Sequence, residues 1–246
     1  MRRIRIYQPG NYAIGDSVVL AEEAAHHVGV VLRQRVGDQL TLFSGDNREC
    51  EAEIIQMHKK AIQVRICQEA YIDKESPLQI ILAQAICKGE RMEWIVQKAV
   101  ELGVTAFFPI ITQHGSYKLA KENLQKKHHQ WQAIAVSACE QCGRNRVPQI
   151  AEPTDLLSFL SREELAASPQ KFLLDPYEGQ SWKSYQQVNK QVVILVGPEG
   201  GFSAAELQSA SQADFLPLYL GPRILRTETA AISAVSLFQA AWGDIA

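Results

Sequence analysis

The hydrophobic pattern of this chain changes its period at residues 73–77, and this change constrains the fold more than any other feature. Before it, short runs at 39–43, 51–55 and 61–66 alternate apolar with polar residues, which is typical of half-buried strands. After it, apolar runs of strand length alternate with helical patterns; in residues 91–102, for example, Met92, Ile95, Val96 and Ala99 share one face. The polar segment 73–77 contains a proline and is a candidate linker. We therefore expect two domains, at 1–72 and 73–246.

The two parts predict different architectures. Several short strands at close spacing, with one short helix around 21–27, predict a small β-barrel or sandwich for residues 1–72. In the second part, strands are expected at 78–85, 104–111, 171–174, 192–196 and 215–220. Helical patterns separate them, including one opened by Ser203 and Glu206 with the spacing of a capping box and a last one at 227–242. This order predicts an α/β domain, a parallel sheet covered by helices on both faces.

Composition excludes several classes of protein. The chain has 246 residues, 46% hydrophobic and 21% charged, as in folded globular proteins. Its 25 Lys and Arg against 27 Asp and Glu give a net charge of −2, which excludes a wholly basic nucleic-acid binder but allows a local basic patch. No apolar run approaches the roughly 18 residues of a membrane span. The odd number of cysteines, 5, argues against a secreted disulfide framework, so a cytoplasmic protein is expected.

Cysteine spacing does not predict a metal site. Cys139 and Cys142 fall late in a predicted helix, on its apolar face. A zinc site usually needs a second pair of ligands, and a redox pair is expected at the start of a helix. Packing is therefore the favoured role, and no metal is expected.

Two glycine-bearing loops, 197–203 and 221–229, each follow a predicted strand and precede a predicted helix. Neither has the glycine spacing of a phosphate-binding loop. Each could be a plain tight turn. However, ligands of open α/β sheets bind beyond the carboxyl ends of the strands, where glycine lets the backbone approach closely. The Arg, Thr and Glu residues of the second loop favour a binding site.

These loops also carry a resemblance. The runs 197–202 (GPEGGF), 220–230 (LGPRILRTETA), 140–144 (EQCGR) and 97–104 (QKAVELGV) resemble the ribosomal RNA small subunit methyltransferase E family, over nearly the whole chain. The resemblance implies an N-terminal PUA-like β-barrel that binds RNA and a SPOUT-type methyltransferase domain with a C-terminal trefoil knot. The order of the elements alone predicts an unknotted, doubly wound sheet. The implied reaction is the S-adenosylmethionine-dependent methylation of N3 of a uridine in small-subunit (16S) ribosomal RNA. The implied partners are that RNA, or the assembled small ribosomal subunit, and a second copy of the chain in a homodimer.

By this resemblance the two loops and the strand end at 173–176 hold S-adenosyl-L-methionine. Apolar side chains would form a slot for the adenine, and loop backbone would contact its edge. Glu199 could either support the loop or lie near the positive sulfur. The expected donor-binding residues are Leu174, Val196, Gly197, Pro198, Glu199, Gly200, Gly201, Leu220, Gly221, Ile224, Leu225, Arg226, Thr227, Thr229 and Ala230.

The acceptor chemistry singles out two catalytic candidates. The N3 proton must leave, and the charge that develops on the base calls for a cation. Arg226 is the candidate cation, because its guanidinium is planar and forked and hardly deprotonates. Glu228 or water could accept the proton, although Glu228 could also be only a first-turn acid favoured by the helix dipole.

Contacts to RNA are expected from local basic residues. Each could instead be a solvated surface charge. Where the family usually carries an Arg-Ser pair, this chain has Gln113-His114-Gly115-Ser116, which weakens one expected contact. The expected RNA-binding residues are Arg3, Arg5, Arg33, Lys88, Arg91 and Arg144.

Two other functions remain open. One is an RNA methyltransferase of the same fold acting on transfer RNA or on ribose. The other is an RNA-binding or assembly factor without activity.

Overall fold

The computed structural model describes residues 4–58, 61–115, 121–166, 170–186 and 190–245. They form two compact units, and each is described by itself. The first contains the residues up to Glu75 together with Val136–Val147, and the second contains Ser76–Ala135 and Pro148–Ala246. The sequence pattern places a boundary at 72/73 and gives no sign that 136–147 packs with the first unit. Among the described residues, no helix combines the length and apolar character that crossing a bilayer requires.

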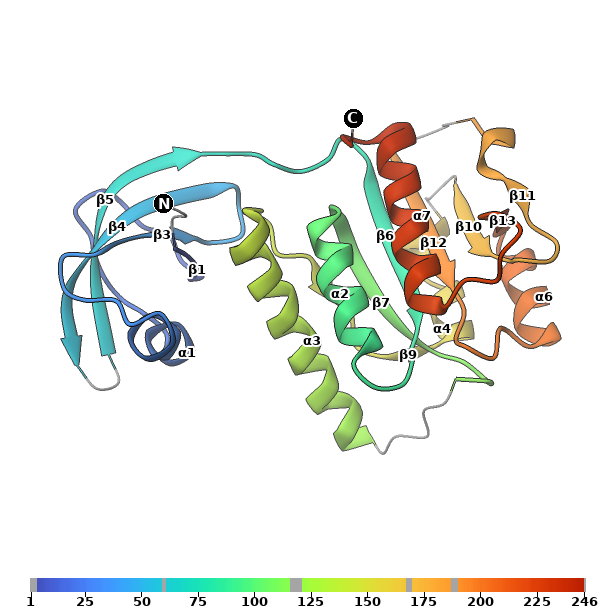
Figure 1. Ribbon diagram of the computed structural model, residues 1–246, viewed down its shortest axis with the longest axis horizontal. Helices are drawn as coiled ribbons and strands as arrows, with labels where there is room; N and C mark the ends of the chain where they lie inside the picture. Colours follow the sequence, from blue (N-terminus) through green and yellow to red (C-terminus); the bar gives the residue numbers. More distant parts are fainter. Residues whose placement is uncertain (1–3, 59–60, 116–120, 167–169, 187–189, 246) are drawn as a thin grey trace. The chain divides into compact units, whose positions relative to one another are not determined.

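The first unit is built on a five-stranded sheet with the order β1-β3-β4-β5-β2 (Figure 1). The strands are β1 (Arg5–Tyr7), β2 (Ser17–Val19), β3 (Gln39–Phe43), β4 (Arg48–His58) and β5 (Ala61–Tyr71). β1 pairs parallel with β3, and the other pairs are antiparallel. Helix α1 (Glu22–His26) runs on into a π-helical turn, η1 (His27–Val31), whose Val28 is buried in the core with Leu42 and Ile54. The alternating pattern therefore predicted this β unit correctly.

The second unit contains an eight-stranded sheet in which every pairing is parallel. Its order is β11-β13-β10-β12-β6-β7-β8, and β9 also pairs with β7. The strands are β6 (Gln79–Ala85), β7 (Val104–Ile111), β8 (Gln149–Ile150), β9 (Thr154–Asp155), β10 (Lys171–Leu174), β11 (Gln180–Ser181), β12 (Gln191–Val196) and β13 (Leu216–Tyr219).

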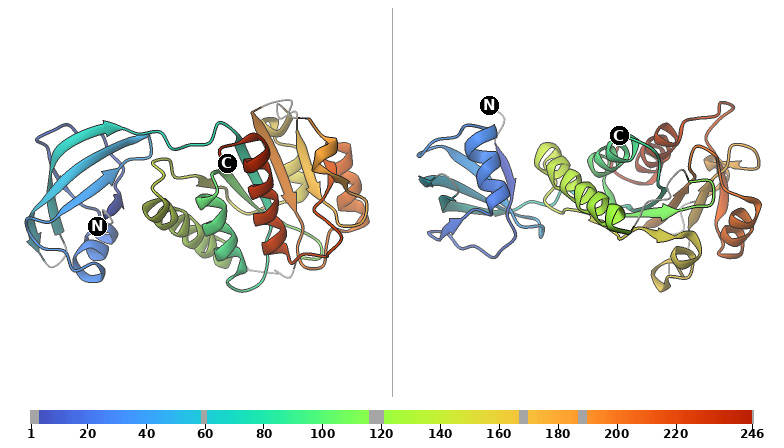
Figure 2. Two further views of the ribbon diagram at one scale, coloured as in Figure 1. Left: turned by 45° about the horizontal axis from the view of Figure 1, so that its top comes forward. Right: turned by 90° about the horizontal axis from the view of Figure 1, so that it is seen from below.

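Helices cover both faces of this sheet, as predicted (Figure 2). Side chains of β10 point alternately to the two layers. Phe172 stacks on Phe238 of α7 (Thr227–Trp242) with ring centroids 4.9 Å apart, on the side that α7 shares with α2 (Arg91–Glu101). The next residue, Leu173, joins the cluster that contains Phe159 of α4 (Leu156–Leu160) and Ala210 of α6 (Ala204–Gln212). The remaining helices are α3 (Lys121–Cys142), α5 (Glu163–Ala166) and the short η2 (Trp182–Ser184). The trefoil knot stays a prediction.

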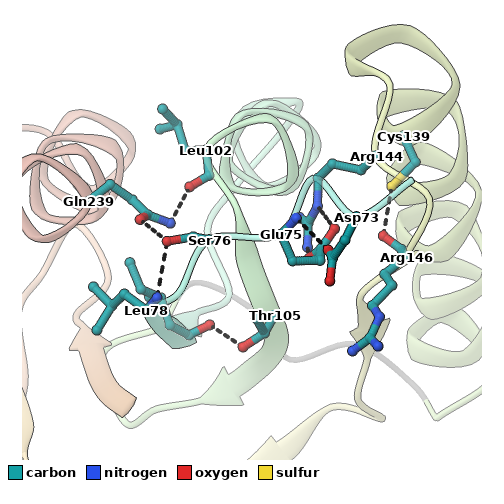
Figure 3. A network of polar contacts seen from close by, with 11 residues as sticks. Asp73, Glu75, Ser76, Leu78, Leu102, Thr105, Cys139, Arg144, Arg146 and Gln239 are labelled. Carbon is teal, nitrogen blue, oxygen red and sulfur yellow. Dashed lines mark hydrogen bonds and ion pairs between the residues drawn. The ribbon is translucent and has the colours of Figure 1, made fainter. Parts of the chain in front are cut away.

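A buried glutamine fixes the last helix in the second unit (Figure 3). Gln239 Nε2 donates a hydrogen bond to the carbonyl of Leu102 at 2.9 Å, and its Oε1 accepts one from Ser76 Oγ at 2.7 Å. The same Ser76 oxygen accepts the N–H of Leu78 at 3.1 Å. These bonds join the end of α7 to the end of α2 and to the start of β6, so the C-terminal end of α7 has a defined position on the sheet.

Candidate functional site

A cavity of about 730 Å³ lies where the loops after β10, β12 and β13 meet. These strands are neighbours in a parallel sheet, so their carboxyl ends share one edge. Pockets for small ligands usually have volumes of about 300–1,000 Å³. The structure brings together all the predicted donor-binding residues except Thr229. Those that line the cavity are Leu174, Val196, Gly197, Pro198, Glu199, Gly200, Gly201, Leu220, Gly221, Ile224, Leu225, Arg226, Thr227 and Ala230.

Further lining residues were not predicted from the sequence, above all Tyr177, Leu207 and Leu218. Tyr177 follows a turn that Asp175 forms, because Asp175 Oδ1 accepts the N–H of Tyr177 at 2.7 Å and that of Glu178 at 3.1 Å. An Asp-Pro pair directly after a strand is a turn signal that could have found Tyr177. Leu207 and Leu218 lie in a helix and a strand, and no signal separates them from ordinary core residues.

The loop after β12 needs its glycines for different reasons. Gly201 has a φ of +69°, which L side chains rarely adopt. A Cβ on Gly197 would lie 3.1 Å from the ring of Phe202, so the ring packs directly against backbone. A Cβ on Gly200 would lie 3.2 Å from the Cβ of His114. Close packing on both sides therefore defines the shape of this loop.

The segment that carries His114 is attached to the first turn of α6. The predicted capping box is present, since Ser203 and Glu206 exchange side-chain to backbone hydrogen bonds. The other oxygen of Glu206, Oε1, accepts the N–H of Gln113 at 2.8 Å. His114 itself is exposed. Ser116, the last residue of the departure from the family pattern, lies outside the described residues.

A buried hydrogen-bond chain connects the two glycine-bearing loops beneath the cavity. Thr227, the first residue of α7, donates its hydroxyl to the carbonyl of Gly197 at 2.7 Å. That hydroxyl accepts a bond from Gln84 Nε2 at 2.9 Å, and the same amide nitrogen donates to the carbonyl of Ala85 at 2.9 Å. Gln84 is fully buried on β6, and its Oε1 has no partner among the described residues. The chain holds the loop after β12 and the start of α7 against the end of β6.

An ion-pair cluster lies at the edge of the cavity. Arg91 lines the cavity, and its Nη1 donates to Glu199 Oε1 at 2.6 Å. Its Nε lies 3.9 Å from Oε1 of Glu228, whose buried Oε2 has no hydrogen-bond partner among the described residues. Glu228 is not a lining residue, whereas the other catalytic candidate, Arg226, lines the cavity and is exposed.

The buried thiol beside this cluster is not a nucleophile. Burial raises the pKa of Cys87 to about 12, and the negative charges of Glu199 and Glu228 contribute to the rise. The thiol therefore stays protonated at neutral pH and cannot act as the thiolate that nucleophilic chemistry requires.

Two of the predicted RNA contacts are engaged inside the first unit. Arg5 forms an ion pair with Glu49, and its Nη2 donates to Asn145 Oδ1 at 2.6 Å. Arg144 forms an ion pair with Glu75, and its side chain is 6% exposed. These contacts give both arginines structural partners within the first unit.

The remaining basic candidates differ in accessibility. Arg33 and Lys88 are exposed, and Arg33 has a φ of +53° in the segment before β3. Arg3 lies outside the described residues. Arg91 is tied to the carboxylates of the cavity edge, as described above.

The cysteine pair of α3 shows the features of packing residues. Cys139 is buried, and burial raises the pKa of its thiol to about 12. Its Sγ donates to the carbonyl of Arg146 at 3.4 Å, and Cys142 is partly exposed. Across the described part of the chain, no three His, Cys, Asp or Glu side chains gather as metal ligands would.

Comparisons with known proteins match both units. A family model of an RNA methyltransferase domain covers residues 74–239, and one of an RNA methyltransferase PUA domain covers residues 20–67. The ribosomal RNA small subunit methyltransferase E of Buchnera aphidicola from Acyrthosiphon pisum is 33% identical, over 98% of this chain and 94% of that protein. The enzyme of the same name from Bacillus subtilis is 33% identical, over 87% of this chain and 86% of that protein.

Solved structures agree with these matches. A Legionella pneumophila protein, solved in complex with S-adenosylmethionine, is 50% identical with a TM-score of 0.96, and the match covers 100% of both chains. A ribosomal RNA small subunit methyltransferase E from Neisseria gonorrhoeae, bound to S-adenosylmethionine, is 35% identical with a TM-score of 0.91, again over 100% of both chains. The first unit is thus PUA-like, and the second has the architecture of an α/β RNA methyltransferase.

Proposed function

The chain belongs to the ribosomal RNA small subunit methyltransferase E family, and from that membership we propose that it methylates N3 of a uridine in small-subunit (16S) ribosomal RNA. It is an RNA methyltransferase, and its methyl donor is S-adenosylmethionine. The observation that supports methylation at N3 of a uridine is that the two loops with the family motifs, 197–202 and 220–230, border one cavity.

The residues of the cavity fit this donor. Apolar side chains such as Leu174, Val196 and Leu220 suit the adenine ring, and the glycine-rich backbone offers N–H and C=O groups for its polar edge. S-adenosylmethionine supplies an electrophilic methyl group on a positively charged sulfur when it is bound. Glu199 is held by Arg91 at the cavity edge, which favours its role as a support of the loop.

Arg226 and Glu228 are the residues that we assign to the acceptor. The N3 atom lies on the Watson–Crick edge, so the uridine must be unpaired or flipped out before it can react. Arg226 is exposed at the cavity and stabilises the negative charge that spreads to the two flanking oxygens when the proton leaves. Glu228 accepts that proton through water, because it lies behind the cavity lining and its Oε2 is free of hydrogen-bond donors among the described residues.

The proposed partners are an RNA and a second copy of the chain. Arg33 and Lys88 are exposed cations that provide phosphate contacts, which position an RNA without reading its sequence. The substrate is the small-subunit RNA or the assembled small subunit, and the enzyme works in the cytoplasm as a homodimer with the C-terminal trefoil knot of its superfamily.

Calorimetric titration of the purified protein with S-adenosylmethionine tests the first step, and we expect one donor bound per chain. The methylated nucleoside from a reaction with small subunits is then compared by chromatography with N3-, C5- and 2′-O-methyluridine standards. A product other than N3-methyluridine would reject the proposed position. No methylation of naked RNA or of subunits, despite donor binding, would reject the proposed substrate.

Variants of Arg226 test its role. Arg226→Ala should lower turnover by about 100-fold, as removal of one transition-state donor does in other enzymes, with little change in donor affinity. Arg226→Lys keeps the charge and loses the fork, so it should recover only part of the rate. Unchanged turnover in Arg226→Ala would remove this residue from catalysis.

A further inference from the structure

We propose that Arg91 is a positioning residue of the methyl-donor site, which holds the donor loop through Glu199, and that it is not a contact to RNA. The inference rests on the proposed function, because it assigns the cavity to the donor. It replaces the sequence-based expectation that Arg91 is an RNA-binding residue.

The geometry places one guanidinium at both motif loops. Arg91 is the first residue of α2 and comes from neither loop. Its Nη1 donates to Glu199 Oε1 at 2.6 Å, in the loop after β12. Its Nε lies 3.9 Å from Oε1 of Glu228, in the first turn of α7, which follows the second loop. Arg91 thus bridges the two loops at the cavity edge, while Gln84 and Thr227 connect them underneath.

The bridge matters because of the charges around it. The negative charges of Glu199 and Glu228 both raise the pKa of the buried Cys87 thiol, so the two carboxylates share one partly buried region. Without a cation between them, like charges repel, and the exposed partner turns away. Glu199 is the partner that can do so, because its side chain is 30% exposed and that of Glu228 only 17%. Glu199 itself lines the cavity, so the donor then meets a different surface.

The same contacts oppose a role in RNA binding. A phosphate would have to displace Glu199 from the guanidinium, and Glu228 would remain nearby to repel it. Lys88, three residues earlier, offers the contrast. It is exposed, and within the described ranges no carboxylate lies at ion-pair distance from it. A phosphate contact is therefore open to Lys88 and blocked at Arg91.

The expected effect is local. Side chains of Arg91 and Glu199 are 41% and 30% exposed, and ion pairs with such exposure contribute little to global stability. Loss of the pair should therefore change the donor site without unfolding the protein. Lys88→Gln is a matched control that removes one positive charge from the segment just before α2.

The experiment measures donor affinity by calorimetry and RNA affinity at several salt concentrations for the full chain and four variants. These are Arg91→Gln, Glu199→Gln, the double variant and Lys88→Gln. Arg91→Gln should weaken donor binding about 2- to 5-fold, the range that an exposed ion pair can supply, and leave RNA affinity and its salt dependence unchanged. Lys88→Gln should do the opposite and reduce the salt slope by about one. In the Glu199→Gln background, Arg91→Gln should have little further effect, since the pair acts as one unit.

Steady-state rates separate positioning from a general loss of structure. Arg91→Gln should raise the KM for the donor with a smaller change in kcat, and Arg91→Lys should recover part of the donor affinity by keeping one bond to Glu199. Equal donor affinity in Arg91→Gln and the wild type, with RNA binding weakened as in Lys88→Gln, would overturn the inference. Additive effects of the two single substitutions would also overturn it. A wild-type protein that binds no donor, with or without RNA, would instead reject the proposed function itself.

Discussion

The hydroxyl of Thr227 is the link on which the donor cavity depends most directly, and Thr227→Val tests it. Valine has nearly the same shape and lacks the hydroxyl. The carbonyl of Gly197 then loses the donor it has at 2.7 Å, and Gln84 Nε2 loses the acceptor it has at 2.9 Å. Gln84 keeps its bond to the carbonyl of Ala85, so Gly197 is the group left without a partner.

The loss of stability follows from the single carbonyl that is left without a donor. A buried polar group without its partner costs about 1–3 kcal/mol. Gly197 is only partly buried and lines the cavity, so the lower part of this range applies, a loss of about 1–2 kcal/mol in the free energy of unfolding. In a protein of this size, that loss corresponds to a fall in Tm of about 2–8 °C. Gly197 lines the cavity, so part of the same loss falls on donor binding. A loss of about 1.4 kcal/mol there weakens the affinity tenfold.

Differential scanning calorimetry and titration with S-adenosylmethionine measure the two effects. Thr227→Ser is the control, because serine retains the hydroxyl and loses only a methyl group, so its donor affinity should stay close to that of the wild type. If Thr227→Val binds the donor as tightly as Thr227→Ser and melts at the same temperature, the hydrogen-bond chain does not hold the loops and the reasoning is refuted.

Three other predictions concern stability. Gly103→Ala should destabilise the protein by about 1–2 kcal/mol, because Gly103 has a φ of +85° and a Cβ there would lie 2.7 Å from Gln239 Nε2; an unchanged Tm would contradict this. Arg144→Met leaves the carboxylate of Glu75 buried without its cation and should cost about 3–5 kcal/mol in urea unfolding, whereas a cost below 1 kcal/mol would show that the carboxylate finds water. Burial raises the pKa of Glu49, but hydrogen bonds from Asn145 and Arg5 lower it by more, and the net pKa is below the usual value. Glu49 therefore stabilises the fold above its unfolded pKa of about 4.3, and the contribution disappears as the pH falls through the folded pKa. Glu49→Gln should accordingly show a flatter loss of stability between neutral and acid pH, and an identical acid limb would contradict the assignment.

Strong periodic patterns made most of the second unit predictable. The predicted bounds of β10 and α7 are those observed, because a short apolar run and a 3.6-residue repeat each leave one interpretation. Residues 149–184 escaped prediction, apart from β10. Their strands β8, β9 and β11 have two residues each, which is too short for any period to be seen.

Polar residues with buried roles were harder to predict from the sequence. Arg5 and Arg144 look like surface cations, because a pattern of charges does not tell which carboxylate lies opposite in space. Their partners, Glu49 and Glu75, are 44 and 69 residues away along the chain. The packing of 136–147 with the first unit could not be predicted for a similar reason. The apolar residues of α3 repeat with the same period whichever unit covers them.

The site itself was only partly visible in the sequence. Glycine motifs located the two loops but not the residues that hold them together, Gln84 and Arg91, which lie outside both motifs. Gln84 did carry a signal, since it is a glutamine inside the apolar run 80–86, where a polar side chain must find a partner.

The position of these two residues in the chain has a consequence for how the cavity is built. Glycines allow close approach but do not fix a loop, because they have more accessible conformations than any other residue. The loop after β12 and the start of α7 are fixed instead by side chains from β6 and α2, which precede both loops in the sequence. Gln84 acts under the cavity with neutral hydrogen bonds, and Arg91 acts at its edge with charge. The contribution of Arg91 to donor affinity should therefore weaken as salt is added, since screening weakens an exposed ion pair and leaves a buried neutral bond unchanged. Added salt should shrink the difference in donor affinity between the wild type and Arg91→Gln and leave the difference between the wild type and Thr227→Val unchanged, and the opposite pattern would show that the two connections do not divide the task in this way.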